Sequence, residues 1–310
     1  MHGVKFIPNT TNILFLQRRL LFFIFSASLF FASLTLFVVK GLNYGIDFKG
    51  GILMEVQSPK AFDISSMRKQ LEQLNIGEIA LQEFGQPTEL LIRIQKQEGG
   101  DLAQQKAIQQ VKALLDDTVT YRRTEFVGPK VSDELLWAGI KAVSLAIISI
   151  LFYIWLRFEW QFGVGAVIAL VHDVIATIGI FSILGLEFNL ATVAAVLTIA
   201  GYSINDTVVV YDRVRENLRK YKKRKLIDIL NDSLNQTLSR TVMTSVTTLI
   251  ALIALYILGG PIIKDFSFAM IFGVIIGTYS SVCVAVPILI YLKLDHGQAN
   301  ETNKNYSKSV

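Results

Sequence analysis

Two aspartates and an arginine stand inside or at the edge of long apolar segments, where charged side chains are rare. Asp173 follows His172 well inside one segment, and Asp206 ends the run Gly-Tyr-Ser-Ile-Asn-Asp in the next. Arg240 stands at the start of a later segment. Ionisable residues at such depth are costly, so each of the three is a candidate functional group.

These residue types fit a proton carrier. A carboxylate in a low-dielectric medium favours its protonated form, whereas an approaching arginine favours the ionised form. A helix movement that brings Asp206 and Arg240 together or apart would therefore bind and release a proton. Polar neighbours would hold water along the path: Asn205, Ser203, Thr244, Ser245, Thr247 and Thr248.

Each candidate also has a purely structural interpretation. Asp206 lies near the end of its segment and fits an interfacial acid with satisfied hydrogen bonds. Asp173 with His172 fits a static hydrogen bond between helices. Arg240 fits a topology anchor whose side chain reaches out to the membrane surface. The sequence alone leaves these alternatives open.

The composition indicates a membrane protein. The chain has 310 residues, of which 52% are hydrophobic and only 18% charged, and its mean hydropathy is +0.47. Soluble domains are about 25% charged, and disordered chains lack this apolar content. The single cysteine, Cys283, excludes an internal disulfide, and no Cys/His cluster marks a metal site. We expect no metal and no cofactor.

The apolar residues fall into six blocks of about 20 residues, the length that crosses ~30 Å of hydrocarbon. We expect the first block to be a retained helix rather than a cleaved signal peptide, and the last to be tilted or partly interfacial. The six predicted spans cover residues 20–39, 137–156, 162–184, 190–211, 242–258 and 266–292.

Positive charge predicts the orientation. The net charge is +5, and Lys and Arg gather in the short connections on one side of the predicted spans. We therefore expect a bacterial inner-membrane protein with both termini in the cytoplasm. The basic run 220–225 fits a topology signal that also contacts anionic lipid. Four segments follow: a cytoplasmic N-terminus 1–19, an outer domain 40–136, a cytoplasmic basic loop 212–241 and a cytoplasmic tail 293–310.

The outer segment reads as a small α+β domain. Alternating and helical patterns occur in the order βαββαβ, which is the ferredoxin-like arrangement, and Asp63 is a candidate helix N-cap. No catalytic constellation is present, which favours a domain that binds a polymer or moves. The expected strands are 51–57, 78–84, 89–95 and 119–127, and the expected helices are 63–74 and 101–115.

Two further patterns concern packing and energy. Small residues recur every fourth position at Ala269, Gly273, Gly277 and Ser281, which predicts a close-packed helix face. No phosphate-binding loop follows Gly50-Gly51, so any work must draw on an ion gradient or on a partner ATPase. We expect a protein that is not an enzyme.

Several strings resemble the SecD/SecF family. The segment Gly-Ile-Asp-Phe-Lys-Gly-Gly at 45–51 resembles the family signature Gly-x-Asp-Phe-x-Gly-Gly, with Lys49 as a local departure, and Phe-Val-Gly-Pro at 126–129 resembles a second one. Val-His-Asp-Val at 171–174, Gly-Tyr-Ser-Ile-Asn-Asp-Thr at 201–207, Asp-Arg-Val-Arg-Glu-Asn at 212–217 and Leu-Ser-Arg-Thr at 238–241 are similar to its SecF branch. The signature residues are Gly45, Asp47, Phe48, Gly50, Gly51, Gly128 and Pro129.

The resemblance implies more than the patterns show. It implies a six-span core like half of a resistance-nodulation-division (RND) transporter, with a periplasmic domain between the first two spans. It implies the partners SecD, the SecYEG channel, YajC and a translocating preprotein, with membrane lipids around them and no nucleic acid. Export would use protons, with Asp206 and Arg240 at the family's proton-passage positions, while the principal carboxylate belongs to SecD.

Two other functions share these features. A half of a small-molecule RND efflux pump has the same six-span core and intramembrane acids, although such pumps have two halves and larger outer loops. A membrane chaperone or scaffold that binds emerging chains without using energy is the third hypothesis.

Overall fold

The computed structural model of the chain describes residues 11–84, 86–115, 118–259, 261–292 and 294. It forms two compact units, a helical one (residues up to 42, 145–186 and from 194 on) and a small mixed one (43–144 and 187–193). The first ten residues and almost all of the predicted tail lie outside the described part, so their expected placement stays a prediction.

Among the described residues, six helices are long and apolar enough to cross a membrane, which confirms the number of spans predicted. A short 3-10 turn at Phe15–Arg18 precedes the first of them. In α6, α7 and α9, half or more of the most apolar window is buried, whereas α1, α5 and α8 expose most of theirs. The helices are α1 (Arg19–Lys40), α5 (Pro129–Arg157), α6 (Trp160–Leu184), α7 (Leu190–Lys220), α8 (Leu226–Leu258) and α9 (Pro261–Ser280).

The segment 212–241, expected as a basic loop, is mostly helical. Helix α7 continues to Lys220 and α8 begins at Leu226, so only a short turn separates them. The amide of Asn217 donates to Ser233 Oγ at 2.8 Å and to Gln236 Oε1 at 3.0 Å, which ties the two extensions together. Apolar runs locate only the hydrophobic part of a helix, so they did not reveal these extensions, which carry polar and basic residues. The cytoplasmic location of the segment stays a prediction.

The last span changes its winding near its end. Helix α9 gives way to a π-helical turn at Ser281–Ala285 and a short α10 at Val286–Ile288. Pro287 has no N–H to continue the α-helical pattern, and its ring crowds the preceding turn, which accounts for the altered winding. The hydroxyl of Tyr211 on α7 donates to the carbonyl of Ala285 at 2.9 Å, so this turn is held by a neighbouring helix.

Close approach between helices depends on small residues. A Cβ on Gly179 of α6 would lie 2.7 Å from the Cα of Ser33 on α1, so only glycine allows this contact. On α9, a Cβ on Gly277 would lie 3.1 Å from the Cβ of Ser203, and one on Gly273 would overlap Ile199. The small-residue face predicted on the last span is therefore confirmed at these two glycines.

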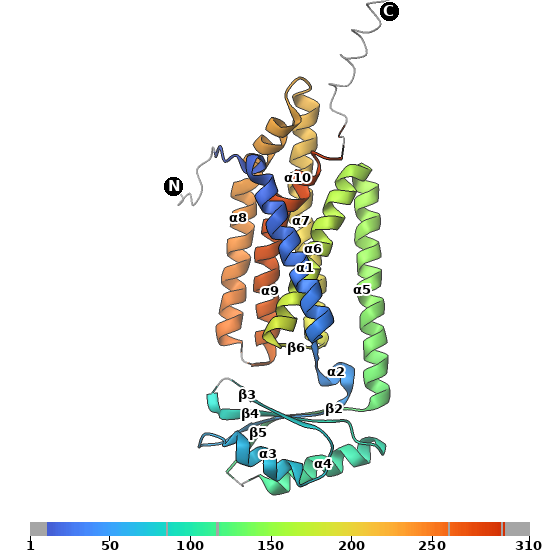
Figure 1. Cartoon of the computed structure of the whole chain (residues 1–310), viewed down its shortest axis with the longest axis vertical. Coiled ribbons are helices and arrows are strands. Elements are labelled where there is room, and N and C mark those ends of the chain that lie inside the picture. Colours follow the sequence, from blue (N-terminus) through green and yellow to red (C-terminus); the bar gives the residue numbers. More distant parts are fainter. Residues whose placement is uncertain (1–10, 85, 116–117, 260, 293, 295–310) are drawn as a thin grey trace, which may run out of the picture. The chain divides into compact units, whose positions relative to one another are not determined.

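The small unit has the predicted βαββαβ order. Its antiparallel sheet runs β3-β4-β2-β5, and α3 and α4 lie on one face of it (Figure 1). Residues such as Met54, Ile92 and Val111 form the buried core between sheet and helices. Asp63 accepts hydrogen bonds from the backbone N–H groups of Ser65 and Ser66, which confirms the predicted N-cap. The elements are β2 (Gly51–Gln57), α3 (Ile64–Glu72), β3 (Ile79–Phe84), β4 (Gln86–Ile94), α4 (Gly100–Leu114) and β5 (Thr120–Val127).

Three short elements of this unit were not predicted. A two-residue strand β1 (Asn43–Tyr44) pairs in parallel with β6 (Glu187–Phe188), which lies just before α7. The helix α2 (Ile46–Lys49) follows β1 and carries part of the signature. Such short pieces have no periodicity of their own, because a long-range pairing defines them.

Candidate functional site

Asp173 is fully buried in α6 at the meeting point of three helices. Its Oδ2 accepts hydrogen bonds from Ser203 Oγ on α7 at 2.6 Å and from Ser280 Oγ on α9 at 2.7 Å. Its Oδ1 lies 3.0 Å from Nδ1 of His172, so the predicted contact between these two side chains is present. The carboxylate therefore joins α6, α7 and α9 inside the helical unit.

His172 itself has one unused polar atom. Its Nε2 is buried and has no hydrogen-bond partner among the described residues. The ring lies 6.3 Å from that of Tyr279, between centroids. A histidine held by a carboxylate on one nitrogen and free on the other can accept or donate a proton at the free nitrogen.

Asp206 is buried on α7 with one oxygen bonded and one free. Its Oδ1 accepts a hydrogen bond from Thr241 Oγ1 on α8 at 2.7 Å. Its Oδ2 is buried and has no partner among the described residues. Burying a carboxylate oxygen without a partner is costly, so this atom is a place for a proton, a water or a moving cation.

Arg240 and Asn205 both lie on exposed faces of the helical unit. Arg240 precedes Thr241 on α8, yet it forms no ion pair with Asp206 in the described part of the chain. The structure therefore shows the two candidate partners without direct contact. Asn205 is exposed beside buried Asp206, because adjacent residues on a helix point in different directions.

The row of hydroxyl side chains that follows Arg240 on α8 bonds mostly to carbonyls of the same helix. It consists of Thr244, Ser245, Thr247 and Thr248. Thr244 donates to the carbonyls of Arg240 and Thr241, and Thr247 and Thr248 bond in the same way one turn on. Ser245 reaches another helix, lying 2.7 Å from Thr278 Oγ1 of α9, as Thr241 reaches Asp206 on α7. The row thus supplies one link between α8 and α9.

Sequence reasoning missed the serines that join the two carboxylates. Ser280 holds Asp173, and the neighbouring Ser281 lies 3.0 Å from Thr207 Oγ1, next to Asp206. Ser203, expected to hold water, instead donates to Asp173. Ser281 was visible in the sequence as the end of the small-residue face, but that pattern predicts packing rather than hydrogen bonding, and Ser280 does not belong to it.

The first signature segment fastens the start of α7. The carboxylate of Asp47 accepts a hydrogen bond from the backbone N–H of Leu190, the first residue of α7, at 2.9 Å. A carboxylate at this position satisfies a free N–H group and opposes the positive end of the helix dipole. Phe48 is buried against Phe188 of β6, with ring centroids 6.1 Å apart. Gly45 donates to the carbonyl of Phe188 at 3.0 Å.

The paired glycines of the signature turn the chain into the sheet. Gly50 and Gly51 have φ values of 70° and 119°, which side chains disfavour. A Cβ on Gly51 would also lie 2.5 Å from the carbonyl oxygen of Ile94 on β4. In the second signature, the carbonyl of Gly128 accepts from the N–H of Ser132, and Pro129 is the first residue of α5, where a missing N–H costs nothing.

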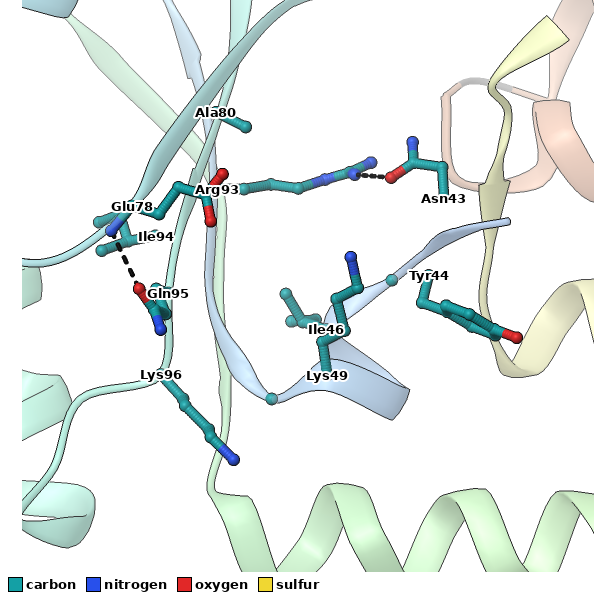
Figure 2. Close-up of a pocket in the computed structure, with 12 residues that line it drawn as sticks. Asn43, Tyr44, Ile46, Lys49, Glu78, Ala80, Arg93, Ile94, Gln95 and Lys96 are labelled. Carbon is teal, nitrogen blue, oxygen red and sulfur yellow. Dashed lines mark hydrogen bonds between the residues drawn. The ribbon is translucent and has the colours of Figure 1, made fainter. Parts of the chain in front are cut away.

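A basic pocket opens beside the first signature. It has a volume of about 320 Å³, and its lining includes Lys49, Arg93 and Lys96. Figure 2 shows Arg93 and Lys49 extending toward the same space between β4 and α2. Arg93 is held by Asn43 Oδ1 at 3.1 Å and by an ion pair with Glu187. Glu187 precedes α7, so this arginine also ties the sheet to the start of that helix.

Metal chemistry finds no support in the described residues, which contain no group of three or more His, Cys, Asp or Glu able to hold an ion. The chemistry that the helical unit offers is that of carboxylates, one histidine and hydroxyls. Such groups bind and pass protons.

Comparisons with known proteins point to one family over nearly the whole chain. Sequence models described as "Protein export membrane protein SecD/SecF, C-terminal" and "SecD/SecF GG Motif" match residues 106–295 and 35–58. A protein translocase subunit SecF of Cereibacter sphaeroides is 47% identical, with 97% of this chain and 96% of that protein covered. A protein translocase subunit SecF of Rickettsia akari is 45% identical, with 93% of this chain and 94% of that protein covered.

Solved structures show the same likeness. The crystal structure of the translocon-associated membrane protein SecDF from Thermus thermophilus superimposes with a TM-score of 0.84 and 34% identity. A crystal structure of SecDF in a super-membrane-facing form superimposes with a TM-score of 0.65 and 30% identity. These matches cover 93% and 99% of this chain but only 39% and 41% of the SecDF chains. The chain belongs to the SecD/SecF family of protein export membrane proteins, and its near-full-length relatives are the SecF subunits.

Proposed function

We propose that the chain is an accessory subunit of the Sec preprotein translocase that works with SecD to use the proton gradient for protein export. The observation that carries this proposal is the match to SecF subunits over nearly the whole chain, at 45–47% identity. A small-molecule efflux role finds no support in the comparisons. The role is that of a transport subunit rather than of an enzyme.

The partner SecD is supported by an exposed polar face on two spans. Thr198, Gly201 and Asn205 are exposed on α7, and Arg240 and Thr244 are exposed on α8. Amide and guanidinium groups facing hydrocarbon are costly, so another membrane protein must cover this face. SecD is the proposed cover, because the matched SecDF chains are more than twice as long as the part that this chain matches.

The proton path is proposed to run through Asp206, Arg240, Asp173 and Asn205. The free Oδ2 of Asp206 supplies a place for a proton. Arg240 is the neighbour of Thr241, which already bonds to Asp206, so a small movement of α8 would bring Arg240 to this carboxylate. Ser281 and Ser280 would connect this carboxylate to Asp173 across α9. SecD would supply the other side of the path.

Movement of the small unit is proposed to follow movement of α7. Asp47 contacts Leu190 in the first turn of this helix, and Arg93 contacts Glu187 in the strand β6 that precedes it. Helix α7 continues without interruption to Asp206. A shift of α7 on proton binding would therefore pull on the small unit through these two contacts.

The location follows from the same proposal. The chain would lie in the bacterial inner membrane with both termini in the cytoplasm and the small unit in the periplasm. It would act beside the SecYEG channel, with YajC as a further associate, on a preprotein that emerges from the channel. The positively charged connections would face the cytoplasm and its anionic lipids.

Purification in mild detergent tests this proposal. We expect the affinity-tagged chain to bring down SecD and the SecYEG channel. A Gly201→Phe variant places a large ring on the exposed polar face and should lose SecD. An Ile148→Phe variant, on the 62% exposed side chain of α5, is the control and should keep it. Recovery of the chain without SecD would contradict the proposal.

A further inference from the structure

A second group of charged residues lies at the turn between α5 and α6. Helix α5 ends at Arg157 and α6 begins at Trp160, so a tight turn joins two apolar spans. Trp155 and Trp160 flank this turn and are 69% and 61% exposed. Exposed tryptophans at the end of a span mark the boundary between hydrocarbon and lipid headgroups.

The end of α7 reaches the same boundary. Its 31 residues extend about 46 Å, more than the ~30 Å of hydrocarbon, so its last turns lie in the headgroup region. There it contacts the turn: Arg157 donates two hydrogen bonds to Asp212, at 2.8 and 2.9 Å, and Arg215 donates to the carbonyl of Arg157 at 3.3 Å. Both guanidinium groups also lie over the ring of Phe158, at 5.0 and 5.4 Å from its centroid.

These residues border an open pocket of about 510 Å³. Both carboxylates on its wall already have an arginine partner, Asp212 with Arg157 and Glu216 with Arg213 at 2.8 Å. Neither Arg219 nor Lys220 forms an ion pair within the described part of the chain. The lining consists of Arg157, Asp212, Arg215, Glu216, Arg219 and Lys220, so cations outnumber acids by four to two.

We propose that this pocket binds the phosphate headgroup of an anionic phospholipid. An excess of two positive charges suits one or two phosphates, and arginine forks match phosphate geometry. The apolar part of the lipid has a surface to follow, because Trp160, Val164 and Ile168 are exposed at four-residue intervals along α6. The pocket lies at the headgroup boundary that Trp155 and Trp160 mark, which favours a lipid over a free anion.

Tryptophan quenching tests the site. The chain contains three tryptophans, and a Trp137→Phe background leaves Trp155 and Trp160 as reporters at the pocket. The purified full chain is reconstituted in phosphatidylcholine vesicles with increasing amounts of brominated phosphatidylglycerol. We expect saturable quenching at low phosphatidylglycerol content, and weaker quenching when the brominated lipid is phosphatidylcholine.

Two matched double variants separate the pocket from general attraction. Arg219→Gln with Lys220→Gln should weaken the apparent affinity by more than about 30-fold, because it removes the hydrogen bonds to the phosphate as well as the general attraction of two charges to an anionic surface, roughly fivefold each. Lys222→Gln with Lys223→Gln removes the same charge from exposed positions of the basic run outside the pocket, so it loses only the general attraction and should weaken the affinity by about 30-fold at most. Circular dichroism checks that both variants fold.

Three results would overturn the proposal. The first is equal quenching by the two brominated lipids. The second is an equal loss in both double variants, which would mean diffuse attraction to the basic run. The third is full displacement of the lipid by inorganic phosphate at constant ionic strength, which would mean a site for free anions.

Discussion

Replacing Asp173 tests whether the buried carboxylate is a static link between helices or a proton carrier. Asp173→Leu removes the acceptor of three contacts: Ser203 at 2.6 Å, Ser280 at 2.7 Å and His172 at 3.0 Å. Hydrogen bonds between membrane helices contribute about 0.6 kcal/mol on average and about 1.7 at most. We therefore expect Asp173→Leu to lower the free energy of unfolding by about 2 to 5 kcal/mol.

Asp173→Asn is the matched variant. Its amide oxygen still accepts from both serines, although a neutral acceptor makes bonds about half as strong as a charged one. We expect a loss of only about 1 kcal/mol. Asparagine cannot take up a proton, so this variant should fold and yet lose export driven by the proton gradient.

The assays are unfolding of the purified chain in increasing dodecyl sulfate, followed by circular dichroism, and export by vesicles that contain SecD. If the Asp173→Leu variant and the wild-type chain have equal free energies of unfolding, the structural part of the reasoning is refuted. An asparagine variant with undiminished gradient-driven export would refute the proton-carrying part and leave Asp173 as a static link.

Three further predictions concern other contacts. Asp47→Ala and Asp63→Ala each remove a helix cap worth about 1 kcal/mol, but only Asp47→Ala should reduce gradient-driven export in vesicles, and equal effects would contradict a link through α7. Gly179→Ala should cost about 1–3 kcal/mol in dodecyl sulfate unfolding because α1 must move. Gly201→Ala, in open space, should stabilise the helix slightly in the purified chain, and a similar cost at both glycines would refute the packing argument. Gly51→Ala should open strands β2 and β4 to limited proteolysis, and unchanged cleavage would show that its backbone tolerates a side chain.

The sequence predicted the elements that have a strong pattern of their own. Six apolar blocks became six helices, and the alternation in the small unit predicted all four of its sheet strands. The Asp63 cap was predictable because its partners lie two and three residues away. The extended ends of α7 and α8 were not, because hydropathy marks only the part of a helix that lies in hydrocarbon.

The candidate site was predicted as a set of residues but not as a set of contacts. Asp173, Asp206 and Arg240 stood out because charges are scarce in apolar segments. Their partners are serines and threonines on other helices, such as Ser280 and Thr241, and nothing in their local sequence separates them from packing residues. Interhelical pairing depends on the rotation of each helix, which a single sequence does not determine.

The link between Asp47 and α7 shows the same limit. The signature was recognised as a string, without the contacts that its residues make. The role of Asp47 depends on Leu190, and two spans, α5 and α6, separate these residues in the sequence. The parallel pairing of β1 with β6 and the contacts of Gly45 and Phe48 with Phe188 bring the two together.

The most direct test of the central claim is preprotein export into inverted vesicles that contain SecD and this chain, measured with and without a proton gradient. We predict that the gradient stimulates export by the wild-type chain. We also predict that Asp206→Asn and Arg240→Met insert normally but abolish the stimulation. Stimulation that persists unchanged in both variants, or wild-type export that continues undiminished after the gradient is collapsed, would contradict the account.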